Sequence, residues 1–262
     1  MRKILLFPCL VTLLSCLTCQ TRGSGTLVQF STINALLQGV YEGPTSFADL
    51  KKYGDFGIGT LNSLDGEMIT LEGKSYQITS DGKTHPIPDS GHTPFATVTF
   101  FHPDEKFTVE PSAIYIQLQE LLDRRLPSKN YFYALRIKGT FSNLKVRSVP
   151  RQSPPYRDLK EVSKSQTVFQ WKDIRGTLIG FRCPAFAKGF NVPGYHFHFI
   201  SENRDCGGHV LDCALASGDV SVDTLEKIQV LLPANEAFAN AKLDQYDDIS
   251  MQAVEKQTTP AR

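Results

Sequence analysis

Residues 194–209 narrow the possible folds of this chain more than any other feature. They read GYHFHFISENRDCGGH, and histidines alternate with aromatic residues from position 195 to position 199. Successive side chains of a β-strand point to opposite faces, so a strand here places His196 and His198 on one face and three aromatic rings on the other. The polar stretch 201–208 has the length of a hairpin connection, so the returning strand brings His209 beside them.

Three imidazoles in this arrangement predict a metal site. His196, His198 and His209 are half of the six histidines in the chain, and such clustering is not expected of ordinary half-buried histidines. Three neutral imidazoles suit zinc and leave coordination positions open for water or substrate, which is typical of a catalytic site. Iron and manganese are alternative metals for the same ligands. The remaining histidines lie in turn-rich sequence and are predicted to be at the surface: His85, His92 and His102.

Hydrophobic periodicity and turn residues predict a strand-rich α+β fold with a few short helices. Asp-Gly at 65–66 and Glu-Gly at 72–73 mark hairpin turns, because glycine readily adopts positive φ. Helical spacing of apolar residues predicts a helix at 112–122. A shorter helix is predicted at 46–52, with Ser46 as its N-cap, and another at 235–241, and residues 26–37 begin as a strand and continue toward a helix. We predict mostly antiparallel strands, within mixed or antiparallel sheets, at 58–61, 68–71, 76–79, 95–101, 131–138, 139–146, 167–171, 174–182, 194–201, 209–217 and 221–232.

The mature chain is expected to form two related subdomains. Its length of 262 residues, of which 41% are hydrophobic, is enough for a substantial core. The pentapeptides GIGTL at 57–61 and IRGTL at 174–178 are faintly alike. We therefore predict an N-terminal α/β subdomain at 26–150 and a C-terminal subdomain at 151–262, which carries the metal site and the tail. The net charge is +1 and no basic patch stands out, so nucleic acid is not an expected partner.

Residues 1–25 are interpreted as a leader and a linker. Arg2 and Lys3 precede an apolar run at 4–14 that is too short to span a bilayer, as in a signal peptide. Leu13-Leu14-Ser15-Cys16 resembles a bacterial lipobox, whose cysteine becomes a lipidated N-terminus. We expect an exported protein that is periplasmic or anchored through lipid on Cys16. The alternatives are a conventional signal peptide cleaved within 18–25, and a protein that stays in the cytoplasm.

Three cysteines remain after the leader, which leaves at least one thiol unpaired: Cys183, Cys206 and Cys213. Cys206 and Cys213 flank the end of the histidine segment, so either a disulfide between them or metal ligation is open on spacing alone. Metal ligation by cysteine is not needed, because the three histidines suffice.

Two charged residues are candidates for acting beside the metal. Glu67 follows the Asp-Gly turn, and Arg147 ends a predicted strand before a proline-containing loop at 149–156. The alternative for each is an ordinary solvated surface charge.

Five stretches of the chain resemble the α-acetolactate decarboxylase family. The similarity extends from about residue 26 to about residue 255, and the histidine segment is its most specific part. The similar stretches are 57–61, 64–67 (LDGE), 93–99, 147–156, and 191–199 continuing to Gly207-Gly208-His209.

The resemblance implies a zinc-dependent carboxy-lyase that converts (S)-2-acetolactate to (R)-acetoin and CO₂. It implies His196, His198 and His209 as zinc ligands, with Glu67, Arg147 and Glu255 acting beside the metal. Glu67 and Arg147 lie in matching motifs, whereas Glu255 lies in a less distinctive tail. The family also implies a homodimer of two-subdomain chains and no organic cofactor.

This chemistry is physically coherent. A divalent ion that chelates the keto and hydroxyl oxygens of acetolactate stabilises the enediolate left by loss of CO₂. The guanidinium of Arg147 matches the substrate carboxylate, and Glu67 or Glu255 donates the proton to one face of the enediolate. Either glutamate is alternatively a further metal ligand.

Two other functions stay open on the sequence. One is a different three-histidine metalloenzyme, a hydrolase or an oxygenase, and the other is a non-catalytic exported metal-binding protein. For an exported decarboxylase, the hypothesis is that it removes acetolactate that has escaped from the cell.

Overall fold

Strands dominate the computed structural model, which describes residues 25–110 and 112–244. The strands are β1 (Gly25–Phe30), β2 (Thr45–Ser46), β3 (Phe56–Thr60), β4 (Glu67–Leu71), β5 (Lys74–Ile78), β6 (Thr84–Pro86), β7 (His92–Thr93), β8 (Ala96–Thr99), β9 (Glu105–Val109), β10 (Ala113–Ile114), β11 (Phe132–Ser148), β12 (Thr167–Trp171), β13 (Ile174–Cys183), β14 (Gly194–Ser201) and β15 (Gly207–Leu231). The helices are α1 (Ile33–Leu37), α2 (Phe47–Leu50), α3 (Tyr115–Arg125), α4 (Leu159–Val162) and α5 (Glu236–Asn240), with 3₁₀ turns η1 (Asn62–Leu64), η2 (Ser163–Ser165) and η3 (Ala185–Ala187).

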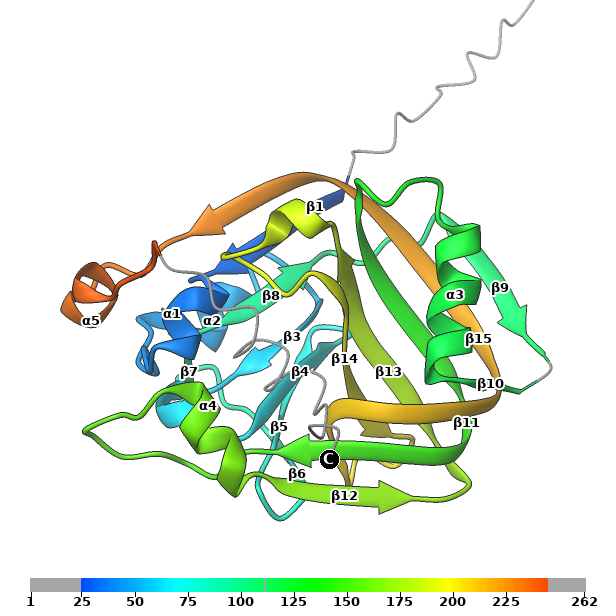
Figure 1. Cartoon of the computed structure of the whole chain (residues 1–262), viewed down its shortest axis with the longest axis horizontal. Helices are drawn as coiled ribbons and strands as arrows, with labels where there is room; N and C mark the ends of the chain where they lie inside the picture. The colour runs from blue at the N-terminus through cyan, green and yellow to red at the C-terminus, as the bar shows by residue number, and fades with distance from the viewer. Residues whose placement is uncertain (1–24, 111, 245–262) are drawn as a thin grey trace, which may run out of the picture.

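One 13-stranded sheet runs through the described part of the chain. Its main path is β12-β11-β13-β14-β15-β1-β8-β3-β4-β5-β6, and β9 and β10 pair with β15. The pairs are antiparallel except for β1 with β15, so the sheet is mixed. In Figure 1 the sheet curls, with α3 against one flank and α1 and α2 at the other. The strand-rich α+β prediction is confirmed.

The two longest strands correct the sequence prediction. Residues 131–138 and 139–146 were predicted as separate strands, and so were 209–217 and 221–232, but they form the continuous strands β11 and β15. Gly139 pairs with Gly218 of β15, and a Cβ at Gly139 would lie 2.3 Å from the carbonyl oxygen of Ser217. Glycine here therefore permits close approach of paired strands instead of ending them.

The principal helix also begins later than predicted. Helical spacing of apolar residues predicts a helix at 112–122, whereas α3 spans Tyr115–Arg125. Ala113 and Ile114 are taken up by β10, which pairs with Leu215 and Ala214 of β15. The hydrogen bonds available from a neighbouring strand therefore decide where this helix starts.

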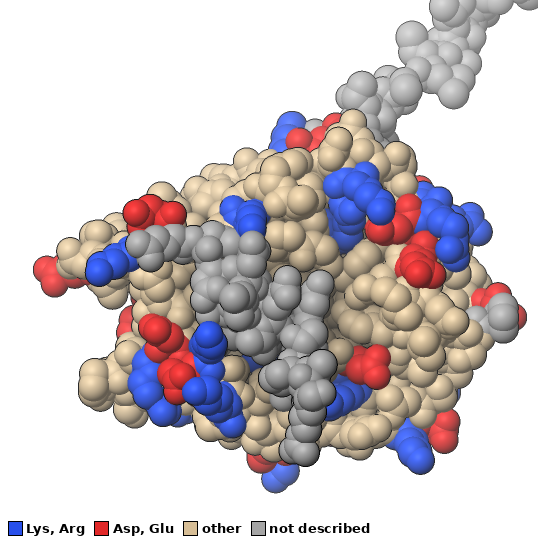
Figure 2. Space-filling model, viewed as in Figure 1, with Lys and Arg blue, Asp and Glu red and all other residues tan. Residues whose placement is uncertain are grey.

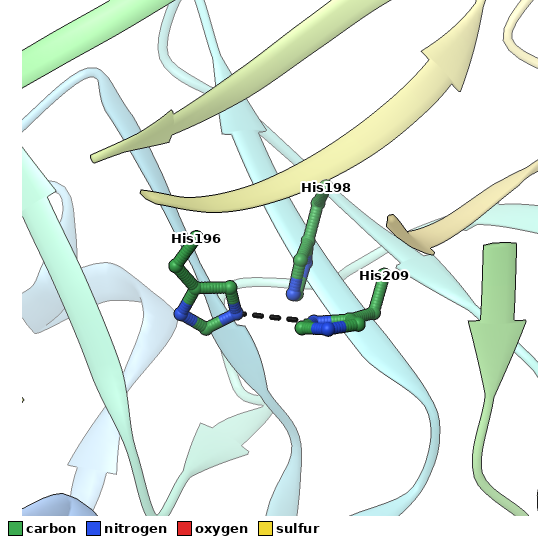
Figure 3. Close-up of side chains that lie close together, drawn as sticks. All are labelled: His196, His198 and His209. Atoms are coloured by element: carbon green, nitrogen blue, oxygen red, sulfur yellow. Dashed lines mark hydrogen bonds between the residues drawn. The ribbon is translucent and has the colours of Figure 1, made fainter. Parts of the chain in front are cut away.

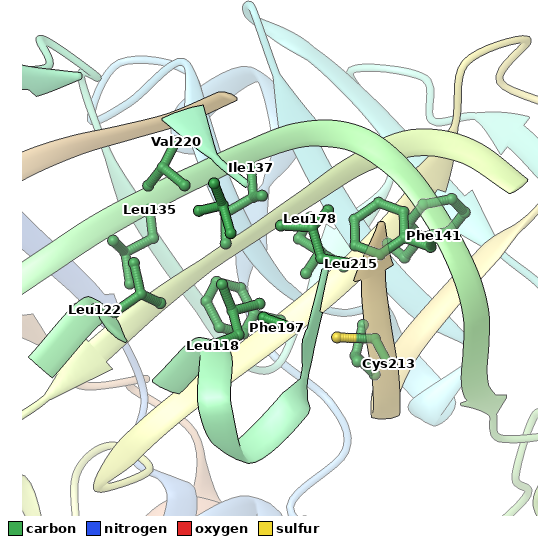
Figure 4. Packing of buried hydrophobic residues seen from close by; sticks show 14 of the residues in the cluster. Leu118, Leu122, Leu135, Ile137, Phe141, Leu178, Phe197, Cys213, Leu215 and Val220 are labelled. Carbon is green, nitrogen blue, oxygen red and sulfur yellow. The ribbon is translucent and has the colours of Figure 1, made fainter. Parts of the chain in front are cut away.

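One face of β14 packs into the hydrophobic core. Figure 4 shows Leu118 and Leu122 of α3 beside Phe197 of β14 and Leu135 of β11, all of them buried. Burying a side chain of this size contributes about 1.5–3 kcal/mol. The predicted packing of the aromatic face of β14 is thus confirmed, and its histidine face must point to the opposite side.

The three described cysteines are all free thiols. Cys183 and Cys213 are buried among apolar side chains, and Cys206 is half-buried. No disulfide joins Cys206 and Cys213, because Cys213 faces the core around α3 and β11.

Several predictions lie outside the described residues, namely the leader, the lipid anchor on Cys16 and the role of Glu255. The boundary at residue 150 falls just after β11 and stays a prediction, as do the homodimer and export. None of the described helices is long and apolar enough to cross a membrane. On the face seen in Figure 2, acidic and basic side chains are interspersed.

Candidate metal centre

Strands β14 and β15 bring the three predicted histidines together. The strands are antiparallel, and His198 pairs directly with His209. His196 lies two residues before His198, so its side chain points to the same face. All three residues are buried, with exposed fractions of 8% for His196, 1% for His198 and 2% for His209. Two predictions from the sequence are therefore confirmed. His196 and His198 lie on the same face of one strand, and the following hairpin brings His209 beside them.

The three rings converge on one point (Figure 3). Nε2 of His196 lies 3.1 Å from Nδ1 of His209, and one nitrogen from each of the three rings lies within 4.8 Å of the others. Nitrogen ligands at 2.0–2.1 Å in tetrahedral geometry are separated by about 3.4 Å. The His196–His209 pair is close to this spacing, and small side-chain adjustments bring all three imidazoles within reach of a single zinc-sized ion.

A backbone carbonyl sets the orientation of His198. Nδ1 of His198 lies 2.9 Å from the carbonyl oxygen of Met68 in β4. A carbonyl only accepts hydrogen bonds, so Nδ1 carries the proton and the lone pair of Nε2 is free for a metal. Such a partner on the far side of the ring is the usual support of a metal-ligating histidine.

Glu67 joins this cluster from β4. Its Oε2 lies 3.6 Å from Nε2 of His198, and the residue is only 6% exposed. Glu67 directly precedes Met68, whose carbonyl holds the other side of the same ring. The surface-charge alternative for Glu67 is therefore wrong.

Arg147 reaches the cluster from β11. It pairs with His209 in the β11–β15 register and is 4% exposed, so it too is no surface charge. Its Nη1 donates a hydrogen bond of 3.1 Å to Oε1 of Gln166, just before β12. Gln166 had no signal in the sequence, because it meets Arg147 only through the pairing of β11 with β12.

Burial and charge keep His196 and His198 neutral. Burial, assisted by the positive charge of Arg147, lowers the pKa of His196 to about 3. Burial, and then the neighbouring His196, holds the pKa of His198 well below its usual value. A neutral imidazole has the lone pair that a metal needs, so the electrostatics agree with the metal-site interpretation.

Apolar side chains line most of the rest of the cavity around Glu67, Arg147 and the histidines, and Gly59 and Thr60 of β3 complete it. The apolar side chains come from α1, η1, α4 and the segments flanking β8 and β11: Ile33, Leu36, Leu64, Phe95, Val149 and Leu159. These residues could not be predicted from the sequence, because an apolar residue that lines a site has the same sequence pattern as an apolar residue of the core. By contrast, His85, His92 and His102 are exposed, as predicted.

Acid is expected to destabilise the metal-free protein between about pH 6.5 and pH 3. The folded pKa of His196 is depressed below that of the unfolded chain, so the stability it contributes is complete above about pH 6.5 and is lost as the pH falls toward 3. The slope is at most about 1.4 kcal/mol per pH unit for each such histidine. The free energy of unfolding in urea, measured between about pH 6.5 and pH 3 on protein stripped of metal by a chelator, tests this expectation. The His196→Gln variant should show a smaller slope, and equal slopes for variant and wild type contradict the expectation.

The comparisons with known proteins agree with this geometry. The family model described as alpha-acetolactate decarboxylase matches residues 27–245. The chain is 50% identical over 233 residues to the alpha-acetolactate decarboxylase of Methanosarcina mazei, covering 89% of this chain and 81% of that protein. It is 41% identical to the Bacillus subtilis protein of the same name, covering 84% and 87%.

Solved structures give the same result. The crystal structure of alpha-acetolactate decarboxylase from Bacillus subtilis strain 168 superposes with a TM-score of 0.87 at 39% identity, covering 88% of this chain and 99% of that one. A Staphylococcus aureus protein of unknown function, described as similar to alpha-acetolactate decarboxylase, superposes with a TM-score of 0.81 at 31% identity, covering 88% and 97%.

Proposed function

The chain belongs to the alpha-acetolactate decarboxylase family, and from that premise we propose that it converts (S)-2-acetolactate to (R)-acetoin and CO₂ with zinc held by His196, His198 and His209. The observation that carries this proposal is the convergence of three buried imidazoles with one buried carboxylate and one buried guanidinium around a single cavity.

The histidine ligands define what the metal contributes. When bound, zinc supplies a Lewis acid for the adjacent keto and hydroxyl oxygens of the substrate. The Met68 carbonyl orients the ring of His198, and the β14–β15 pairing places His209 on the same face, so both side chains lie at the site before a metal or substrate arrives. This preorganisation favours the charged transition state over the ground state.

Arg147 is assigned to the substrate carboxylate. A guanidinium binds a carboxylate with two parallel hydrogen bonds, which fixes the orientation of the bond to be broken. Because CO₂ carries no charge, this ion pair is lost as the reaction proceeds, and the product leaves readily. The burial of Arg147 and its bond to Gln166 support a fixed orientation of the side chain.

Glu67 and Glu255 are assigned to proton transfer, with Glu67 the better supported. The carboxyl group of Glu67 lies at the ligand nitrogen of His198, within the same cavity. A carboxyl group held on one side of the reacting carbon delivers its proton to one face, which sets the configuration of acetoin. The apolar walls at Leu64, Phe95 and Val149 keep bulk water from competing for that proton.

Acetoin release from the metal-loaded protein tests this function. We expect zinc bound at one ion per chain, and acetoin formed from (S)-2-acetolactate with one predominant configuration, as measured by chiral gas chromatography. Chelation is expected to abolish the activity and added zinc to restore it. A folded, zinc-loaded sample that releases no acetoin contradicts the proposal and favours another three-histidine enzyme or a non-catalytic metal-binding protein.

A further inference from the structure

A strained turn lies between β3 and β4, immediately before Glu67. Ser63 has φ 63° and Leu64 has φ 50°, so two successive residues with side chains adopt the left-handed conformation. Side chains disfavour this region, and a non-glycine residue stays there only when its surroundings hold it. Strained backbone of this kind clusters at functional sites, and the contacts of this turn show what holds it.

Backbone hydrogen bonds tie the turn to two other segments. The N–H of Ser63 donates to the carbonyl oxygen of Tyr41 at 2.8 Å, and the N–H of Gln152 donates to the carbonyl oxygen of Ser63 at 2.8 Å. The side-chain amide of Asn62 exchanges two further bonds with the backbone of Gly43, at 2.9 and 3.0 Å. The turn is thus held from both sides.

The hydroxyl of Ser63 forms the centre of a polar cluster, which we name the Ser63 clamp and which comprises Glu42, Ser63, Arg151 and Tyr156. Oγ of Ser63 donates to Oε1 of Glu42 at 3.0 Å, and the hydroxyl of Tyr156, which also bonds Glu42, lies 3.3 Å from Oγ. Nη2 of Arg151 lies 3.4 Å from the same Oγ. A single buried hydroxyl therefore contacts three side chains.

The clamp connects the two segments that carry the charged residues of the site. Ser63 lies four residues before Glu67, and Arg151 lies four residues after Arg147. Arg151 also pairs with Asp65 through Nη1 at 3.3 Å, which closes a second link between the segments. Leu64, only 2% exposed, lines the cavity together with Glu67 and Arg147. A shift of the turn would therefore move a cavity wall and the segment leading to Glu67 together.

We propose that Ser63 is a positioning residue for the decarboxylation, acting through the clamp to hold Leu64 against the cavity and to fix Glu67 relative to Arg147. This inference rests on the proposed function. Ser63 contacts neither the metal ligands nor the cavity charges through any described hydrogen bond, so its effect is on geometry. Without the hydroxyl, the strained turn can relax toward ordinary φ values, and the proton donor is then held less closely over the reacting carbon.

The Ser63→Ala variant tests the proposal. We expect kcat to fall at least about tenfold, since a displacement of catalytic groups by an ångström costs on the order of a hundredfold. KM and zinc content should change less than about twofold, because Arg147 and the histidines stay in place. A general structural defect would lower zinc content and the midpoint of thermal unfolding as well.

Ser31→Ala is the matched control. Ser31 is also a buried serine with positive φ, at 62°, but it lies between β1 and α1 and does not line the metal cavity. It should keep the wild-type kcat. Equal kcat values for the two alanine variants and wild type would overturn the proposal, whereas a wild-type protein that releases no acetoin would overturn the function on which it rests.

A single variant at Tyr156 keeps the proposal testable if Ser63→Ala folds poorly. Tyr156→Phe removes one hydroxyl of the clamp from the other segment and should lower kcat in the same direction. Where Ser63→Ala folds, the double variant with Tyr156→Phe should lose less than the product of the two single effects, because both hydroxyls act through one clamp. Multiplicative effects on kcat would show that the two hydroxyls act independently, and the clamp would be rejected.

Discussion

Replacing His198 with asparagine removes bound zinc and lowers kcat on the order of a thousandfold or more. The loss follows because the metal supplies several kcal/mol of charge stabilisation to the transition state. Asparagine is the informative substitution, since its amide N–H can still donate to the Met68 carbonyl that Nδ1 of His198 contacts at 2.9 Å. Alanine would remove this hydrogen bond as well, at a cost of about 0.5–1.5 kcal/mol in stability.

Zinc per chain, measured by elemental analysis, and acetoin release on the same sample check this expectation. His85→Asn is the control, because His85 is an exposed histidine of β6 outside the cluster. It should retain full zinc and full activity. An asparagine variant at position 198 that keeps wild-type activity after loss of zinc would show that the three-histidine site is not the catalytic centre.

Replacing Glu67 with glutamine lowers kcat about a hundred- to ten-thousandfold while zinc stays bound. Glutamine has nearly the same shape but cannot supply a carboxylic proton, and positioned proton transfer contributes a factor of this size. Zinc is expected to stay because the three imidazoles lie within 4.8 Å of one another without help from Glu67. Pre-steady-state measurement of CO₂ release and acetoin formation on one sample separates decarboxylation from protonation.

Glu72→Gln is the control for this variant. Glu72 lies in the two-residue turn between β4 and β5, and its side chain is 71% exposed. Its replacement should leave both kcat and zinc unchanged. If Glu67→Gln instead loses zinc, Glu67 belongs to the metal shell, and the proton donor must be sought elsewhere, with Glu255 the first candidate.

Regular alternation made β14 predictable to the residue. The predicted bounds 194–201 and 167–171 agree with those of β14 and β12. In β14, histidines on one face alternate with aromatic residues on the other, which leaves a period of two in the sequence. The lengths of β11 and β15 were not predictable in this way. Glycines and bulges inside both strands resemble strand ends in sequence, and only pairing with neighbours shows that the strands continue.

The charged residues of the site were only partly accessible from the sequence. Their positions along the chain made Glu67 and Arg147 candidates, but left an ordinary surface charge as the alternative for each. The family resemblance supplied their roles. Gln166 and Ser63 carried no local signal. Each acts through a partner far along the chain, at 19 residues for Arg147 and 93 for Tyr156.

The sequence by itself determined the metal ligands. Alternation along a strand fixes the face on which His196 and His198 lie, and the length of the hairpin connection places His209 beside them, and both are local properties of the chain. Only the tertiary structure decided which charges and apolar walls surround them. Those residues come from β4, β11, α1 and α4, which lie far apart in the chain and meet only when the curled sheet closes around its core. Burial then lowers the pKa of His196 and keeps its imidazole neutral, and that too is a property of the folded chain.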